Sequence, residues 1–128
     1  MIIPAGRRRG PPSVSLRAPN TANGQQLFAF NSSLCAEFLQ KTRYVALAFD
    51  SKKEKTYFIP CGAMYKNQPT YKLVRDGGNN HSGGKAIYLA GEARQHFARV
   101  RLGKYPVKFV RGMIVIDTPG VGLVEGIT

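Results

Sequence analysis

The sequence predicts a mainly β domain with two short helices, an α+β fold in which two β-α-β-β pseudo-repeats form a small barrel or sandwich. Several short segments of the chain alternate apolar residues with other residues, which is the pattern of half-buried strands. Two segments, 25–61 and 85–119, share one order of strand, helix and hairpin. Neither segment can bury its apolar face alone, so we expect the two to pack against each other.

The chain has 128 residues, enough for one domain with a substantial core. Residues 1–12 combine glycine, proline and arginine without periodicity, which predicts a flexible basic arm. Residues 13–119 form the predicted domain, with 62–84 as an insert between the pseudo-repeats, and 120–128 form a C-terminal tail. No apolar run reaches the about 20 residues of a membrane span, and the first residues lack a secretory pattern. We therefore expect a cytoplasmic protein without membrane contact.

The first elements follow from local signals. A strand is expected within residues 13–19, and 20–24 then form a turn. Each pseudo-repeat begins with a short apolar strand, at 27–30 and at 87–89. A short amphipathic helix follows each strand, and Asn31 is well placed to cap the first helix. The apolar positions at helical spacing are Leu34, Cys35 and Phe38 in the first helix and Ala93, Phe97 and Val100 in the second.

Each pseudo-repeat ends in a predicted hairpin. The alternating positions on one face of its first strand are Val45, Leu47 and Phe49 in the first copy and Tyr105, Val107 and Phe109 in the second. The connecting turns are DSKKEK in the first copy and a tight Arg-Gly in the second. Between the pseudo-repeats, TYKLVRD predicts one more strand, and the glycine-rich DGGNNHSGG predicts a turn or loop.

The segment MIVIDTPGVG, residues 113–122, looks like the metal-and-phosphate loop of a GTPase. A GTPase also needs a Gly-x-x-x-x-Gly-Lys-Ser/Thr loop that opens a helix. The nearest candidate has Gly84 where the lysine is required, no hydroxyl residue after Lys85, and a strand instead of a helix behind it. We therefore expect 114–117 to be the last strand, ended by the Pro-Gly that follows.

Other catalytic arrangements are missing from the sequence. Neither His81 nor His96 has a second histidine or a cysteine at metal-ligand spacing, and the acidic residues form no evident pair. We therefore expect a protein that is not an enzyme, with no catalytic residues, no metal site and no cofactor. Cys35 and Cys61 lie 26 residues apart and are expected to be free thiols.

The positive charge points to a polyanionic partner. Nineteen Lys and Arg face seven Asp and Glu, which gives a net charge of +12. The excess lies in the arm and in residues 61–112, and we interpret it as a surface that binds DNA or RNA through phosphates. The expected phosphate contacts are Arg7, Arg8, Arg9, Lys66, Lys72, Lys85, Arg94, Arg99, Arg101, Lys104, Lys108 and Arg111.

Tyrosines are interleaved with these basic residues. For Tyr65 and Tyr71, in the irregular middle of the chain, stacking on a base and packing in the protein are equally expected. For Tyr44 and Tyr105 we favour packing in the core or at its rim. Lys104 and Lys108 share strand parity, so we expect them on one face. Arg94 and Arg101 are expected seven residues apart along the second helix.

Two known families share parts of this pattern. GKAIYLAGEARQHFARVRLGKYPVKFVRGMIVID resembles the β-α-β-β unit of the swapped-hairpin transition-state regulators of bacteria, which implies two interlocked units that bind duplex DNA. Gly91 stands where that family usually has proline, and the insert 62–84 is foreign to it. The stretch 43–100 is similar to the four-strand-and-helix unit of the Whirly and Pur-type families, including coactivators that bind single strands. Both resemblances imply nucleic-acid binding.

Several alternatives stay open. The sequence does not choose between single and double strands, between DNA and RNA, or between a monomer and a homo-oligomer. Small size and a basic arm suit a protein encoded by a virus or a mobile element. The rival function is a protein-interaction module that regulates or inhibits a nucleic-acid-processing partner, with the apolar tail GVGLVEGIT as a docking strand.

Overall fold

The computed structural model describes residues 11–18, 26–75, 83–89 and 91–122. The elements are β1 (Ser13–Arg17), β2 (Leu27–Phe30), α1 (Ser32–Phe38), β3 (Tyr44–Asp50), β4 (Lys55–Cys61), β5 (Met64–Tyr65), β6 (Gln68–Pro69), β7 (Tyr71–Lys72), β8 (Val74–Arg75), β9 (Lys85–Tyr88), α2 (Glu92–His96), β10 (Gly103–Pro106), β11 (Lys108–Val110) and β12 (Met113–Asp117). This content confirms a mainly β fold with two short helices.

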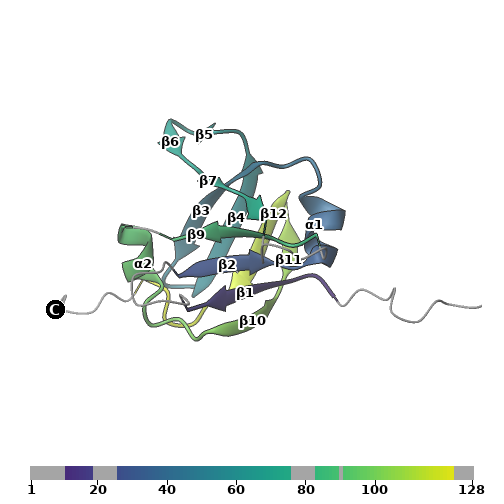
Figure 1. The fold of residues 1–128 in the computed structure, drawn as a ribbon. Coiled ribbons are helices and arrows are strands. Elements are labelled where there is room, and N and C mark those ends of the chain that lie inside the picture. The colour runs from purple at the N-terminus through teal and green to yellow at the C-terminus, as the bar shows by residue number, and fades with distance from the viewer. Residues whose placement is uncertain (1–10, 19–25, 76–82, 90, 123–128) are drawn as a thin grey trace, which may run out of the picture.

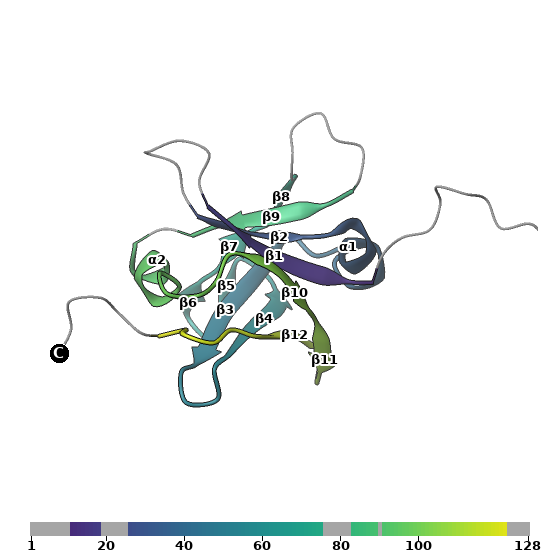
Figure 2. The ribbon, with the colours of Figure 1, turned by 90° about the horizontal axis from the view of Figure 1, so that it is seen from below.

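The strands form two five-stranded antiparallel sheets that face each other. The first sheet has the order β10-β1-β2-β9-β8, and the second has the order β11-β12-β4-β3-β7. β5 and β6 form a separate two-stranded hairpin. Figure 1 looks onto the first sheet, and Figure 2 shows the two sheets one above the other, with α1 and α2 at opposite ends.

The chain passes from one sheet to the other through α1, between β2 and β3, and at two further places where one residue separates consecutive strands. β7 pairs with β3 in the second sheet, and β8 pairs with β9 in the first, with Leu73 alone between them. In the same way, β10 pairs with β1 and β11 pairs with β12, with only Val107 between them. The hydrogen-bonded ladders nevertheless remain two separate sheets, so the predicted closed barrel is not confirmed.

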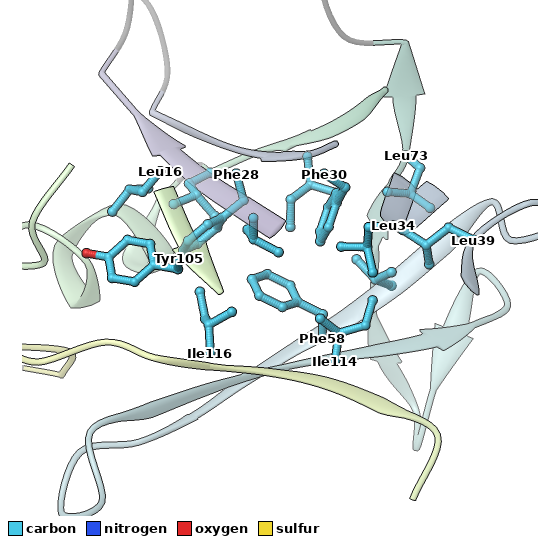
Figure 3. Close-up of a cluster of buried hydrophobic side chains, with 14 of the residues drawn as sticks. Leu16, Phe28, Phe30, Leu34, Leu39, Phe58, Leu73, Tyr105, Ile114 and Ile116 are labelled. Atoms are coloured by element: carbon cyan, nitrogen blue, oxygen red, sulfur yellow. The ribbon is translucent and has the colours of Figure 1, made fainter. Parts of the chain in front are cut away.

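The core lies between the sheets and is dominated by phenylalanine rings (Figure 3). The Phe28 ring packs edge-on against the rings of Phe58 and Phe97, with centroids 5.0 Å apart in both pairs. Phe30 also meets Phe58 edge-on at 5.1 Å. Such pairs contribute roughly 0.5–1.5 kcal/mol each beyond the burial of their area. The rings therefore link the first sheet to the second and to the turn after α2.

Several local expectations are confirmed. The Asn31 Oδ1 caps α1 by accepting from the Leu34 N–H at 3.0 Å. In the turn between β11 and β12, Arg111 and Gly112 have φ angles of 51° and 80°, and two successive positive φ values characterise a type I′ turn. Cys35 is buried, and its Sγ donates to the Phe30 carbonyl at 3.5 Å. Neither Cys35 nor Cys61 takes part in a disulfide, as expected.

The second helix is shorter than expected. α2 ends at His96, so Phe97 and Val100 are buried in the turns that follow it rather than on the helix, and Arg101 lies outside it. The cap position of α2 is occupied by Gly91, which offers no side-chain hydrogen bond to the free N–H groups. The expectation of Arg94 and Arg101 one above the other on a helix is therefore wrong.

The end of β12 explains the Asp-Thr-Pro-Gly segment. β12 ends at Asp117, as expected, and residues 119–122 form turns. Thr118 is buried, its N–H donates to the Glu54 carbonyl at 2.8 Å, and its hydroxyl lies 2.7 Å from that of Thr56. The Gly122 N–H then donates to the His96 carbonyl at 2.8 Å. The threonine hydroxyl thus serves an internal contact between β12 and β4.

The paired hydroxyls predict a double-mutant cycle. Thr118→Val should lower the free energy of unfolding by about 1–3 kcal/mol, because it leaves the Thr56 hydroxyl buried without a partner. Adding Thr56→Val should restore part of that loss, since both polar groups are then gone. Urea unfolding of the two single variants and the double variant measures the cycle. Additive effects would contradict a direct hydroxyl–hydroxyl bond.

Candidate nucleic-acid interface

The outer face of the second sheet carries apolar, aromatic and basic side chains. Phe58, Ile114 and Val45 point into the core, so their neighbours along β4, β12 and β3 point outward. We call this surface the open face; its residues are Tyr44, Ala46, Ala48, Tyr57, Ile59, Cys61, Lys72, Lys108, Val110, Met113 and Val115. Val115 is only 3% exposed, so the neighbouring side chains of this face cover it. α1 and α2 lie at the two ends of the sandwich, and neither covers this face (Figures 1 and 2).

Two tyrosines of the open face share rows of the sheet with lysines. Tyr44 is the direct cross-strand partner of Lys72. Tyr57 and Lys108 occupy one row across the sheet, with Val115 between them. Both tyrosines are half-buried, whereas both lysines are exposed. Tyr44 therefore packs at the outer surface rather than in the core.

An open depression lies at the end of the open face where β3 begins. Its volume is about 450 Å³. We call it the basic depression; its lining residues are Lys41, Thr42, Arg43, Tyr44, Pro60, Cys61 and Gly62. Lys41 and Arg43 are exposed, so two cations border a half-buried tyrosine ring. A phosphate group and a planar base would both find complementary side chains here.

The Cys61 thiol in the basic depression is chemically quiet. Burial raises the pKa of this thiol above its ordinary value, although a hydrogen bond with the backbone of Ala46 acts in the opposite direction. A raised pKa keeps the thiol protonated at neutral pH, and the protonated form is a poor nucleophile.

A second basic surface surrounds α2. We call it the α2 group; its residues, Arg94, Arg99, Arg101 and Lys104, are all exposed. The Arg101 guanidinium lies over the Tyr105 ring, 5.4 Å from its centroid, and the Tyr105 hydroxyl donates to the Arg101 carbonyl. Tyr105 itself is buried, as expected. Its contacts hold the chain of Arg101 in place, and the four cations of the α2 group all lie within residues 94–104.

Lys85 does not belong to the exposed basic residues. It is half-buried, and its Nζ donates to the Leu39 carbonyl at 3.0 Å and to the Thr42 carbonyl at 3.4 Å. These carbonyls lie just after α1, where the helix leaves acceptors unsatisfied and its dipole attracts a cation. The ammonium group of Lys85 therefore serves the fold, and the expectation of an exposed Lys85 is corrected.

Lys104 and Lys108 lie on different sheets, each exposed on the outer side of its own sheet. Lys104 pairs with Ser15 of the first sheet, and Lys108 pairs with Val115 of the second. The chain passes between the sheets at Val107, so equal parity along the sequence does not produce one shared face. The Lys108 Nζ also lies 4.0 Å from the Asp117 carboxylate. Exposed pairs of this kind contribute at most about 1 kcal/mol, so Lys108 remains accessible to another anion.

The remaining expected contacts lie apart from these surfaces. The Lys66 Nζ sits over the Tyr65 ring, 5.4 Å from its centroid, on the β5–β6 hairpin. Arg111 is exposed at the tip of the β11–β12 hairpin. Tyr71 is half-buried against the core, and this burial raises the pKa of its hydroxyl. Tyr71 thus packs in the protein, while Arg7, Arg8 and Arg9 lie outside the described residues.

Three residues of the open face and the basic depression are not among the contacts expected from the sequence: Lys41, Arg43 and Tyr57. Lys41 and Arg43 lie between α1 and β3, in a stretch whose charge is nearly balanced by nearby acids along the chain. The alternation of β4 contains the signal for Tyr57, because the residue beside a buried Phe58 must point outward.

No group of three or more His, Cys, Asp or Glu in the described part of the chain could hold a metal ion. Within the same residues, no helix has the length and hydrophobicity of a membrane span.

No protein-family model, curated protein or solved structure matches the chain. The resemblances to the swapped-hairpin regulators and to the Whirly and Pur-type families therefore stay predictions. The function has to be argued from the side chains described above.

The different roles of two lysines can be measured. Lys85→Met should lower the free energy of unfolding by about 1 kcal/mol, because the carbonyls after α1 lose a charged donor. Lys72→Met, at an exposed position, should change it by less than about 0.5 kcal/mol. Chemical unfolding of both variants compares them. Equal stabilities would show that the ammonium of Lys85 makes no useful contact in solution.

Proposed function

We propose that this protein is a non-catalytic nucleic-acid-binding protein that contacts phosphates through exposed lysines and arginines. The observation that carries the proposal is the α2 group. Its four cations project from a well-packed β scaffold, and no carboxylate of the described residues forms an ion pair with them. A net charge of +12 leaves strong self-repulsion in the free protein, which a polyanion would relieve.

The expected binding mode is dominated by phosphates. Each phosphate that a lysine or arginine neutralises releases counterions from the nucleic acid, so affinity falls as salt rises. If the α2 group engages four phosphates, the logarithm of the binding constant should fall with the logarithm of salt with a slope of about −3 to −4. Binding of this kind tolerates many sequences, because phosphates carry no base information.

The strand pairing supports the hypothesis of an internal duplication. β2 pairs antiparallel with β9, and β4 pairs antiparallel with β12, so equivalent strands of the two pseudo-repeats are neighbours. β1 pairs with both β2 and β10. The segment β7–β8 makes the corresponding pairings, since β7 pairs with β3 and β8 pairs with β9. We propose on this basis that the domain consists of two related halves with approximate twofold symmetry.

A protein-interaction module is the second candidate. It is favoured by Phe109 and Val110 of β11, whose side chains are 45% and 44% exposed beside the hairpin turn. Exposed apolar neighbours of this size are common at protein interfaces. The C-terminal tail that the sequence offers as a docking strand lies outside the described residues from position 123 onward.

A salt series separates the two candidates. Fluorescence anisotropy with labelled single- and double-stranded DNA and RNA should give a binding constant that falls steeply between about 50 and about 200 mM salt. Absent or salt-insensitive binding to all four probes would instead favour the protein-interaction module.

Charge reversal locates the phosphate contacts. The double variant Arg99→Glu with Lys104→Glu should weaken binding to every probe and reduce the salt slope by about 2. The matched control is Lys52→Glu with Lys53→Glu, which changes the net charge equally on the exposed β3–β4 turn. Arg101 stays unchanged because its guanidinium lies over Tyr105. Equal losses in both double variants would mean that the α2 group holds no specific contact.

A further inference from the structure

We propose that the open face and the basic depression at its end bind a single-stranded nucleic acid. Bases stack on Tyr44 and Tyr57, and phosphates contact Lys41, Arg43 and Lys72. The inference rests on the proposed function and adds to it a class of ligand and a second binding surface. The two surfaces then have different roles. The α2 group attracts the phosphates of single or double strands, and the open face binds unpaired bases.

The two rings are spaced for a short tract of bases. Tyr57 lies opposite Ala48, four residues along β3 from Tyr44. Four residues of strand span about 13 Å. Bases that lie flat on the two rings sit side by side on the sheet, each against its own ring, rather than in one continuous stack. A strand of a few nucleotides would therefore reach both rings.

The surface between the rings is low and apolar. Ala46 faces outward between Tyr44 and Ala48 on β3, and Ala48 is the cross-strand partner of Tyr57 on β4. The small alanine side chains leave both rings raised above this part of β3. Ile59, the cross-strand partner of Ala46, lines one side on β4. Planar bases can approach such a floor closely, and apolar neighbours reinforce stacking by excluding water.

Cations border this path where a backbone would run. Lys72 is the direct cross-strand partner of Tyr44. Lys41 and Arg43 line the basic depression together with Tyr44. Lys108 lies in the row of Tyr57, toward the other edge of the sheet. A cation thus lies directly beside Tyr44, and a second cation lies two strands away from Tyr57 in the same row. Stacking on Tyr44 is compatible with a simultaneous phosphate contact.

Carboxylates mark the far end of the path. Asp50 and Asp117 are both cross-strand partners of Lys55, in the row beyond Tyr57. The Lys55 Nζ lies 3.4 Å from Asp117, so the cation of this row is already paired. Asp50 accepts from the N–H groups of Lys52 and Lys53 and is fixed in the turn. The exposed Lys52 and Lys53 of the same turn offset these carboxylates, so this row is close to neutral, whereas the basic depression has two cations and no acidic residue among its described lining residues.

Stacking on half-buried rings discriminates between strand types. In a duplex both faces of each base are occupied by neighbouring bases, so a flat sheet surface with two tyrosines gains nothing from it beyond phosphate attraction. In a single strand the base faces are free, and each stacked base adds affinity. The open face should therefore favour single-stranded over double-stranded nucleic acid.

The test uses the full chain and a labelled oligothymidine of about 12 nucleotides, with a duplex of equal length as the second probe. Tyr44→Ala and Tyr57→Ala should each weaken binding to the oligothymidine by about tenfold or more and leave duplex binding unchanged. Tyr44→Phe and Tyr57→Phe keep the ring and should bind like the wild type. The matched control is Tyr88→Ala, which removes a 46% exposed tyrosine from the first sheet.

Folding is checked by circular dichroism and urea unfolding of each variant. If an alanine variant unfolds, Tyr44→Leu or Tyr57→Leu decides instead, because leucine fills the space but offers no ring for stacking. The chain contains six tyrosines and no tryptophan, so quenching of tyrosine fluorescence gives an independent signal. Oligothymidine should quench the wild type more than the Tyr57→Phe variant.

The outcomes distinguish this inference from the proposed function. Salt-dependent binding of the oligothymidine that no tyrosine variant weakens would overturn the inference and leave the proposed function standing. Stronger binding to the duplex than to the single strand would overturn it in the same way. If the tyrosine variants change self-association of the protein instead of oligothymidine binding, the face contacts a second copy. Absence of binding to any nucleic acid would remove both proposals.

Discussion

The packing of Phe28 and Phe30 from one sheet against Phe58 from the other is the contact on which the rest of the structure depends. These rings fill the space between the sheets, so both helices cover the ends of the sandwich and not its faces. The strands of the second sheet consequently keep an outward surface without a helix over it. The same close packing supplies the rigidity that lets side chains on this surface hold a fixed spacing.

Most elements could be predicted from local patterns, whereas the connection between the sheets could not. The capping side chain of Asn31 and the Arg-Gly turn each act within a few residues, so the sequence reports them directly. The alternating pattern, in contrast, continues through Leu73 and Val107, where the chain leaves one sheet and joins the other. Alternation indicates which side of a strand is buried, but it carries no information about the partner strand.

The candidate site was predictable to the extent that it depends on charge alone. The cations of the α2 group are close in sequence, and their exposure follows from their type. The ammonium of Lys85 meets carbonyls 46 and 43 residues away in the chain, so no local pattern could assign it to the fold. Tyr44 and Tyr57 come together only through the register of β3 with β4, which is a tertiary property.

Asn31 has a consequence for the N-terminal segment. Its Oδ1 accepts from the N–H groups of both Ser13 and Leu34, and its Nδ2 donates to the Pro11 carbonyl at 2.9 Å. One side chain thus anchors the chain at the α1 end of the sandwich, opposite to α2 (Figure 1). The Asn31 backbone N–H also donates to the Ser13 carbonyl at 3.1 Å. The residue that caps α1 therefore acts as a tether that holds the start of β1 at the beginning of this helix.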